Sequence, residues 1–245
     1  MYGLILGIDN IKIFSIFFDV VLEYQETVEL FANETGVKIS LLDRSHSCFY
    51  EVFYENDFFE YFEVEGNEVI SLFIEDLQKI LKTARKGEVL TLSSNEQFVI
   101  AKFEKGDSKR VFELVQSENF GETPPAPSID LECNFITDMD DLERTFKDLD
   151  IIKTNAINFA VKGDSLILST TETAQTRYSH TIDVICENSA VSRYSINYLK
   201  DIVKFKKIDP LVSIELGDSM PLIWSCETNH MVVRGLVAPL MEVED

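Results

Sequence analysis

Two short motifs in this sequence contain the residue types of a nucleophilic active site. Residues 163–166 spell Gly-Asp-Ser-Leu, and residues 43–46 spell Asp-Arg-Ser-His. A serine next to a histidine base can attack an acyl group. The nucleophile then needs a strand-to-helix turn, where backbone N–H groups stabilise the oxyanion. Ser165 instead leads into a stretch with strand character, so we predict a hairpin turn at this position.

Both strings also occur in GDSL-type esterases, where they supply the nucleophile and its base. In that family the serine block lies near the N-terminus and the DxxH block near the C-terminus, and here the order is reversed. A second Gly-Asp-Ser string, at 217–219, indicates that this tripeptide serves as a turn in this chain. A hydrolase that uses Ser165 remains the alternative from another functional class, and a serine-directed probe would test it.

No other pattern in the sequence predicts catalysis or a bound cofactor. His46, His180 and His230 are far apart, and the chain has no P-loop and no GxGxxG string. The four cysteines include no CxxC pair, so we expect reduced, mostly buried thiols in an intracellular protein. The apolar stretch 11–22 is too short and too charged to span a bilayer. We therefore expect no enzymatic activity, no cofactor and no metal site.

The most informative pattern is a segment of about thirty residues that occurs twice. Residues 74–103 align without a gap with residues 196–225, a displacement of 122 (196 − 74). Leu77 coincides with Leu199 in a part with helical spacing, and both copies then change to the alternation typical of a strand. The sequence therefore predicts an α+β fold made of two copies of one unit. We expect domains at 1–117 and 131–245, joined by the proline-rich connecting loop 118–130.

The remaining periodicity predicts the other elements of each half. Helices are expected at 9–23, 74–86, 140–149 and 196–207. Strands are expected at 27–32, 37–42, 48–54, 88–94, 97–104, 109–116, 131–136, 157–161, 165–170, 176–185, 211–216 and 221–226, with a last strand from Met231.

Charge is unevenly distributed between these elements. The chain has 22 basic and 43 acidic residues, a net charge of −21. The segments 10–23, 74–86, 140–153 and 196–207 contain 12 of the basic residues and 10 of the acidic ones, a balance of +2, which leaves −23 for the rest. Basic residues three or four apart form a stripe on three of the helices. The repeated stripes favour a polyanion as partner, bound through its backbone because no base-reading side chains accompany them.

With these features, the chain resembles the sliding clamps of the proliferating cell nuclear antigen (PCNA) type over essentially its whole length. The segments that carry the resemblance are 36–46 (GVKISLLDRSH), 74–84 (IEDLQKILKTA), the proline-rich connector, 197–204 (NYLKDIVK), 218–222 (DSMPL) and 235–242 (GLVAPLME). The last is the most specific, because clamps of this type end in a hydrophobic pair, Ala-Pro and an acidic tail.

The resemblance implies a ring of three chains, with antiparallel sheets outside and two helices per domain inside, around duplex DNA. Such a clamp is a DNA polymerase processivity factor, which tethers polymerase and other replication and repair proteins at replication forks. Its partners would be double-stranded DNA, polymerase and clamp loader, in the cytoplasm of an archaeon or the nucleus of a eukaryote. One subunit of a heterotrimeric clamp is the alternative within the same class.

Three sets of site residues follow. The expected DNA contacts are Lys12, Lys79, Lys82, Arg85, Arg144, Lys147, Lys200, Lys204 and Lys207. The expected subunit interface joins one chain's 109–116 to another's 176–185 through Lys109, Val111, Leu114, Arg177, Tyr178 and Ile182. The resemblance also implies a pocket for a short partner peptide, formed by Leu42, His46, Phe49, Ala126, Ile129, Pro221, Leu236, Val237, Ala238, Pro239 and Met241.

The sequence departs from the family pattern in two places. Ile16 and Leu22 occupy positions where family members typically have lysines, so the first helix contributes little basic charge. Ser47 and Leu236 stand where the family usually has an apolar residue and an aromatic in the partner pocket.

Overall fold

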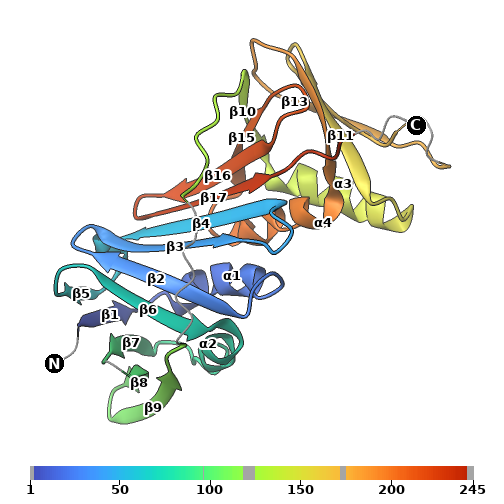
Figure 1. Cartoon of the computed structure of the whole chain (residues 1–245). Helices are drawn as coiled ribbons and strands as arrows, with labels where there is room; N and C mark the ends of the chain where they lie inside the picture. Colours follow the sequence, from blue (N-terminus) through green and yellow to red (C-terminus); the bar gives the residue numbers. More distant parts are fainter. Residues whose placement is uncertain (1–2, 96, 118–124, 172–174, 242–245) are drawn as a thin grey trace. The chain divides into compact units, whose positions relative to one another are not determined.

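The structure is a computed structural model that describes residues 3–95, 97–117, 125–171 and 175–241 (Figure 1). These residues form two compact units. Unit 1 comprises Met1–Arg44, Tyr50–Pro125 and Glu227–Val233, and unit 2 comprises Ser45–Phe49, Ala126–Cys226 and Arg234–Asp245. Residues 45–49 were expected in the first domain but belong to unit 2, and residues 227–233 were expected in the second domain but belong to unit 1. The difference arises because strands β4 (Cys48–Glu55) and β17 (Met231–Val237) contribute residues to both units. Part of the expected connecting loop, 118–124, lies outside the described residues.

Unit 1 contains two antiparallel sheets and two helices. One sheet has the strand order β5-β1-β7-β8-β9, and the other contains β6, β2 and β3 followed by β4. The elements are β1 (Leu4–Ile8), α1 (Ile11–Val21), β2 (Thr27–Asn33), β3 (Gly36–Leu42), the 3₁₀ turn η1 (Asn56–Phe58), β5 (Tyr61–Val64), β6 (Glu68–Phe73), α2 (Ile74–Leu81), β7 (Val89–Ser94), β8 (Phe98–Lys105) and β9 (Ser108–Val115).

Unit 2 repeats this plan with the strand orders β10-β15-β16-β17 and β13-β12-β11-β14. Its elements are β10 (Cys133–Asp138), α3 (Met139–Ile151), β11 (Ala156–Lys162), β12 (Ser165–Ser169), β13 (Ser179–Asp183), β14 (Ala190–Ser195), α4 (Ile196–Leu199), the 3₁₀ helix η2 (Ile202–Lys207), β15 (Leu211–Leu216) and β16 (Leu222–Thr228).

Strand register shows how closely the two units correspond. Leu4 pairs with Ser94 in unit 1, and Cys133 pairs with Leu216 in unit 2. Between the two units, the residue number in the first strand of this pair increases by 129 (133 − 4), and the residue number in the second strand increases by 122 (216 − 94). The pairs β2–β6 and β11–β14 keep the same two displacements. A one-residue slip would move every side chain to the other face of the sheet, so a common register preserves a common core.

The last predicted helix, 196–207, is only partly an α-helix. One α turn is followed by the 3₁₀ helix η2, in which Lys204 N–H donates to Asp201 O (3.0 Å). Leu199, Ile202 and Phe205 are all fully buried and follow one another at intervals of three. A spacing of three matches the 3₁₀ helix, which has three residues per turn, better than the α-helix.

Four strands were not predicted from the sequence. β1 is a short apolar run, and β5 and β6 are short strands in an acidic stretch that had no assigned structure. β14 was missed because one of its inward positions is Ser192, which is 4% exposed and breaks the hydrophobic alternation. Each of these strands pairs with a strand far away in sequence, and these pairings supply stability that local sequence does not reveal.

Candidate nucleic-acid and partner-binding surfaces

The Gly-Asp-Ser-Leu motif forms a hairpin turn, as the sequence predicted. Gly163 has a φ of +57° and, with Asp164, connects β11 to β12 through the pair Lys162–Ser165. Ser165 begins strand β12 and pairs with Asp183 of β13. A strand position lacks the turn into a helix that an esterase nucleophile requires. Among the described residues, no group of three His, Cys, Asp or Glu side chains is placed to hold a metal ion.

The nine expected DNA contacts fall into two groups. Five of the nine expected DNA contacts form ion pairs with nearby carboxylates: Lys79 with Glu75, Arg144 with Asp141, Lys147 with Glu143, Lys200 with Asp150, and Lys204 with Asp201. Within the described part of the chain, no ion pair engages the other four, Lys12, Lys82, Arg85 and Lys207, and all four are exposed.

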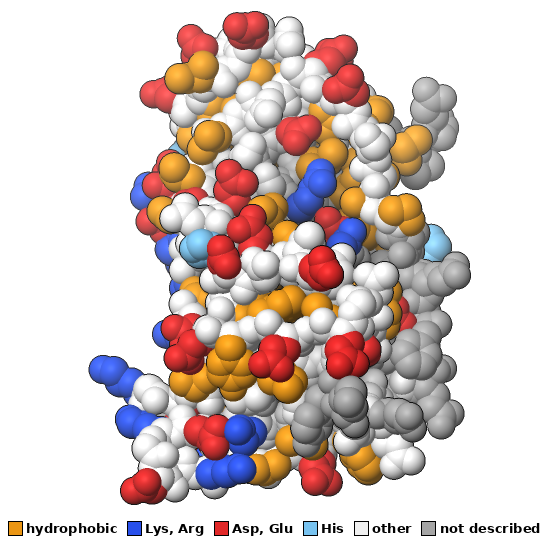
Figure 2. Space-filling view, turned by 90° about the vertical axis from the view of Figure 1, so that its left-hand side faces the viewer, with side chains coloured by type: hydrophobic (Ala, Val, Ile, Leu, Met, Phe, Trp, Pro, Cys, Tyr) orange, Lys and Arg blue, Asp and Glu red, His pale blue; other side chains and the backbone are white. Residues whose placement is uncertain are grey.

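This division changes which residues can bind phosphate most readily. An exposed ion pair contributes about 0–1 kcal/mol, so a phosphate can compete with it, but part of the lysine's charge is already neutralised. Lys12, Lys82 and Lys207 have no ion pair within the described residues and offer their full charge, whereas the charge of Arg85 also interacts with Glu88. Figure 2 shows acidic and hydrophobic side chains over much of one face, with Lys and Arg side chains near its lower end and also along its left-hand edge.

Helix α1 offers little basic surface, as its sequence predicted. Seven of its residues are buried, among them Ile16, one of the positions where a lysine was expected from the family pattern. Asn10 caps the helix by accepting a hydrogen bond from Ile13 N–H (3.4 Å). The helix is tied to α2 by Gln78 Nε2, which donates to Asp19 Oδ1 (2.6 Å). Lys12 is the only basic residue of α1.

Ion pairs connect α3 to η2 in unit 2. Lys206 Nζ contacts Glu143 Oε2 (2.9 Å) and also pairs with Asp140. The hydrogen bonds from Lys147 and then Lys206 lower the pKa of Glu143 to about 2. A carboxyl whose pKa is lowered by folding stabilises the native state above its unfolded pKa, and this contribution is lost as pH falls through the folded value.

We expect the free energy of unfolding to fall as pH decreases from about 4.5 toward 2, in part through Glu143. The contribution should be about 1 kcal/mol or less, since its partners are exposed to solvent. The variant Glu143→Gln should lose this part of the pH dependence in urea titrations. Glu104→Gln, which removes an exposed pair with Lys102 in unit 1, serves as the control. Equal slopes for Glu143→Gln and the parent chain would contradict the assignment.

Part of the expected partner pocket comes together within unit 2. A shallow hollow is lined by Phe49, Ala126, Pro127, Ile223, Arg234, Gly235 and Leu236, which include three of the expected residues. Its enclosed space, about 10 Å³, is about enough for one water molecule, so a larger side chain would rest on its surface. Arg234 was missed, although it lies two residues before Leu236 on the same face of β17 and strand alternation could have identified it.

The other expected pocket residues have different environments. Val237 is fully buried, so it belongs to the core and cannot line an open surface. Leu42 belongs to unit 1, whereas the hollow is formed by unit 2. Beyond β17 the chain is held by two backbone hydrogen bonds, Ala238 N–H to Ser47 O (2.8 Å) and Leu240 N–H to Arg193 O (2.7 Å). The remaining residues, His46, Ile129, Pro221, Ala238, Pro239 and Met241, lie in unit 2 and are partly or largely exposed, but they do not line the hollow.

Each unit presents one open strand edge at the expected subunit interface. β9 ends the five-stranded sheet of unit 1, and β13 ends the four-stranded sheet of unit 2. Gln116 N–H donates to Gln97 O (3.1 Å), which extends the β8–β9 register by one pair. Hydrogen-bonded pairs alternate in an antiparallel ladder, so the even-numbered residues of β9 bond to β8 and the odd-numbered ones face the open edge.

The side chains of the expected interface residues follow the same alternation. Lys109 and Val111 are exposed on one face, and Val111 is 48% exposed, whereas Leu114 is 7% exposed and packs into unit 1. In unit 2, Ile182 is buried in β13. Arg177 and Tyr178 precede β13, and Tyr178 O–H donates to Asp148 Oδ2 (3.1 Å).

The duplicated antiparallel units, each with an open edge, and the basic helical segments define a DNA-clamp type of protein. Residues 7–117 match the family model described as "Proliferating cell nuclear antigen, N-terminal domain". This match, the relatives named DNA polymerase sliding clamp and the similar PCNA structures all indicate a PCNA-family sliding clamp.

Relatives and solved structures match nearly the whole chain. A protein named DNA polymerase sliding clamp from Methanothermobacter thermautotrophicus is 29% identical, with 93% of this chain and 94% of the relative covered. DNA polymerase sliding clamp 2 from Saccharolobus solfataricus is 27% identical, with 82% and 84% covered. Among solved structures, Entamoeba histolytica PCNA has a TM-score of 0.89 at 15% identity, covering 98% of this chain and 100% of that one. A chain of the PCNA2–PCNA3 complex from Sulfolobus tokodaii has 0.85 at 20% identity, covering 96% and 98%. These likenesses confirm the predicted clamp fold.

Proposed function

We propose that this chain is a subunit of a ring-shaped DNA sliding clamp that acts as a processivity factor for DNA polymerase. The observation that carries the proposal is the match, over nearly the full length of both chains, to proteins named DNA polymerase sliding clamp. Its role is to bind and tether, with no reaction of its own. Among the described residues, no helix is long and apolar enough to cross a membrane. We place its action inside the cell, at replication forks.

The charge distribution supports sequence-independent binding of duplex DNA. Lysine and arginine side chains on the helices reach phosphates, which are the same at every base pair, so the ring slides without being arrested. Lys12, Lys82, Arg85 and Lys207 are the principal contacts in this proposal, and the ion-paired residues contribute less. Topological enclosure of the DNA, rather than tight binding, then keeps the polymerase on its template.

Native mass measurement tests the assembly. A closed homotrimer has a mass of 84 kDa (3 × 28.0 kDa), and the single chain 28.0 kDa. A polymerase run-length assay on primed circular DNA with a clamp loader then tests the function. A single chain at all concentrations, together with no effect on run length, would contradict the homotrimeric clamp.

A heterotrimeric clamp is the second candidate. Three of the relatives are named sliding clamp 2 or sliding clamp 3, and one matching structure is a complex of PCNA2 and PCNA3. In this case the purified chain alone stays below 84 kDa and reaches that mass only when paralogous chains of the same organism are added.

We further propose that an apolar side chain of a short partner peptide, such as a polymerase tail, packs against the surface of the hollow around Phe49 and Leu236. Leu236→Asp should weaken binding of a labelled polymerase tail peptide by about tenfold or more, because it places a charge where the peptide's apolar side chain would pack. Fluorescence anisotropy measures this effect. The melting temperature should change little, because Leu236 is only half-buried.

The neighbouring residue provides the matched control. Val237 is fully buried on the other face of β17, so Val237→Asp should unfold unit 2 rather than affect peptide binding selectively. Unchanged peptide affinity in a folded Leu236→Asp variant would place the partner site elsewhere.

A further inference from the structure

Strand β9 is an edge strand of unit 1. Its backbone pairs with only one strand, β8, and its other edge is open. Leu114 is its only buried residue. An edge that pairs with another chain binds more tightly when it is held in its bound conformation beforehand, because less conformational entropy is lost on association.

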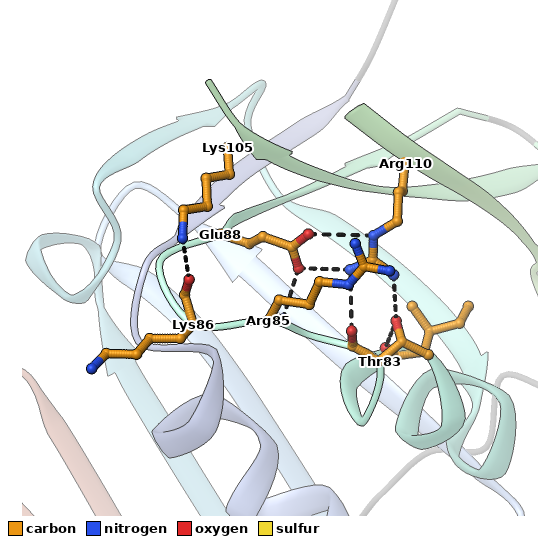
Figure 3. Close-up of polar contacts among 7 residues, drawn as sticks. Thr83, Arg85, Lys86, Glu88, Lys105 and Arg110 are labelled. Atoms are coloured by element: carbon orange, nitrogen blue, oxygen red, sulfur yellow. Dashed lines mark hydrogen bonds and ion pairs between the residues drawn. The ribbon is translucent and has the colours of Figure 1, made fainter. Parts of the chain in front are cut away.

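Arg110 ties β9 to the loop that follows helix α2 (Figure 3). Its Nε and Nη2 donate to the two carboxylate oxygens of Glu88 (3.3 and 2.6 Å). Its Nη1 donates to the Thr83 hydroxyl and its Nη2 also to the Thr83 carbonyl (both 3.1 Å). The guanidinium lies 4.7 Å from the centroid of the Phe103 ring. Four of the five N–H groups of Arg110 are therefore engaged, a pattern that only a planar fork can satisfy.

The loop between α2 and β7 is closed by the same carboxylate. Glu88 is 3% exposed and also accepts a hydrogen bond from the backbone N–H of Arg85 (2.7 Å). Burial raises the pKa of Glu88, but the bonds from Arg110 and Arg85 outweigh this effect and lower it, so the carboxylate is charged. Lys105, at the end of β8, adds a second tie by donating to Lys86 O (2.7 Å).

This network links two surfaces with different proposed roles. The loop presents Lys82, Arg85 and Lys86 to solvent, and the Lys86 side chain points away from the network in Figure 3. The other end of the network is β9. In unit 2, the position equivalent to Glu88 is Pro210 (210 − 88 = 122), which has no carboxylate. The duplicated fold therefore forms without this network, and its presence in unit 1 needs a separate reason.

We propose that Arg110 and Glu88 are positioning residues that hold β9 ready to pair with a second subunit and connect it to the basic loop. The inference rests on the proposed function, since the partner strand is that of another clamp subunit. The pair acts through β9 and does not itself contact the partner.

The test compares Arg110→Lys with Glu26→Gln. Lysine keeps the charge but has three donors and no planar fork, so it cannot make all four hydrogen bonds to Glu88 and Thr83. Glu26→Gln removes an exposed ion pair with Arg44 elsewhere in unit 1. We expect Arg110→Lys to weaken subunit association on the order of tenfold, since hydrogen bonds to a charged group are lost. Analytical ultracentrifugation well below the melting temperature measures this change. The melting temperature of the dissociated chain should change little while the association constant falls, and Glu26→Gln should leave both unchanged.

A second variant keeps the test decisive if the lysine variant folds poorly. Arg110→Met combined with Glu88→Gln removes both charges, so no unpaired carboxylate remains buried, and it should fold yet associate weakly. Wild-type association in either folded variant would overturn the proposal. If the parent chain itself never associates, the proposed clamp assembly is wrong, and the positioning role of Arg110 must be tested without it. Amide exchange at residues 109–115 then decides: faster exchange in Arg110→Lys supports the positioning role, and unchanged exchange overturns it.

Discussion

Val111→Pro is expected to convert the assembled clamp into single chains of 28.0 kDa. Residue 111 is odd-numbered, so its backbone N–H faces the open edge of β9 and its side chain is 48% exposed. Proline removes that edge donor without removing a bond of the β8–β9 ladder, and prolines are tolerated at such edge positions. Light scattering at increasing protein concentration measures the loss of assembly.

Two variants of neighbouring positions complete this experiment. Val111→Ala keeps the donor and should still assemble. Leu114→Pro is not equivalent to Val111→Pro, because residue 114 bonds to β8 and its side chain is buried, so this change should also destabilise unit 1. A folded Val111→Pro chain that still forms an 84 kDa species (3 × 28.0 kDa) would mean that β9 is not the joining strand.

Removing the charges of Lys12, Lys82 and Lys207 together is expected to cause the largest loss of DNA binding. None of these lysines has an ion pair within the described residues, so each can release a counterion from a phosphate. Replacing the three with Gln should lower the slope of log binding constant against log salt concentration by about 3, at roughly 0.9 per phosphate contact. The loss should be the same on all DNA sequences, because phosphates carry no base information.

The matched control removes the same number of charges from ion-paired positions. Lys79, Arg144 and Lys147, replaced together with Gln, should reduce the salt slope less, because each is already bonded to a carboxylate of its own helix. Fluorescence anisotropy of a labelled duplex at several salt concentrations compares the two triple variants. An equal reduction of the salt slope in both variants would show that the ion pairs break when DNA binds. In that case, ion pairing would not distinguish strong DNA contacts from weak ones.

Much of the fold could be predicted from the sequence because it depends on local periodicity. The start of helix α2 at Ile74 and of α4 at Ile196 follows from one repeated pattern, as do β7 and β15. The hairpin turns at Gly106 and Gly163 follow from glycine's access to positive φ, which the structure shows at both positions. The exclusion of Ser165 as an esterase nucleophile needed only the strand pattern that follows it.

The ion pairs of the candidate site could also have been predicted from the sequence. Lys79, Arg144, Lys147 and Lys204 pair with carboxylates three or four residues earlier, a spacing visible in the sequence. Counting only the basic residues of each stripe therefore overstated the charge offered to a polyanion. The pair of Lys200 with Asp150 is different, because fifty residues separate the two.

By itself, the sequence determined the duplication, the starts of α2 and α4, the hairpin turns and the resemblance to sliding clamps, because each depends on residue types at short, regular spacing. Tertiary structure alone decided that Val237 is core while Leu236 reaches a hollow, and that Arg110 closes on Glu88 across 22 residues. It also decided that short segments around β4 and β17 are exchanged between the units. The physical reason is the same in each case: burial and charge pairing depend on neighbours that strand pairing and chain folding bring together, and local sequence does not specify those neighbours.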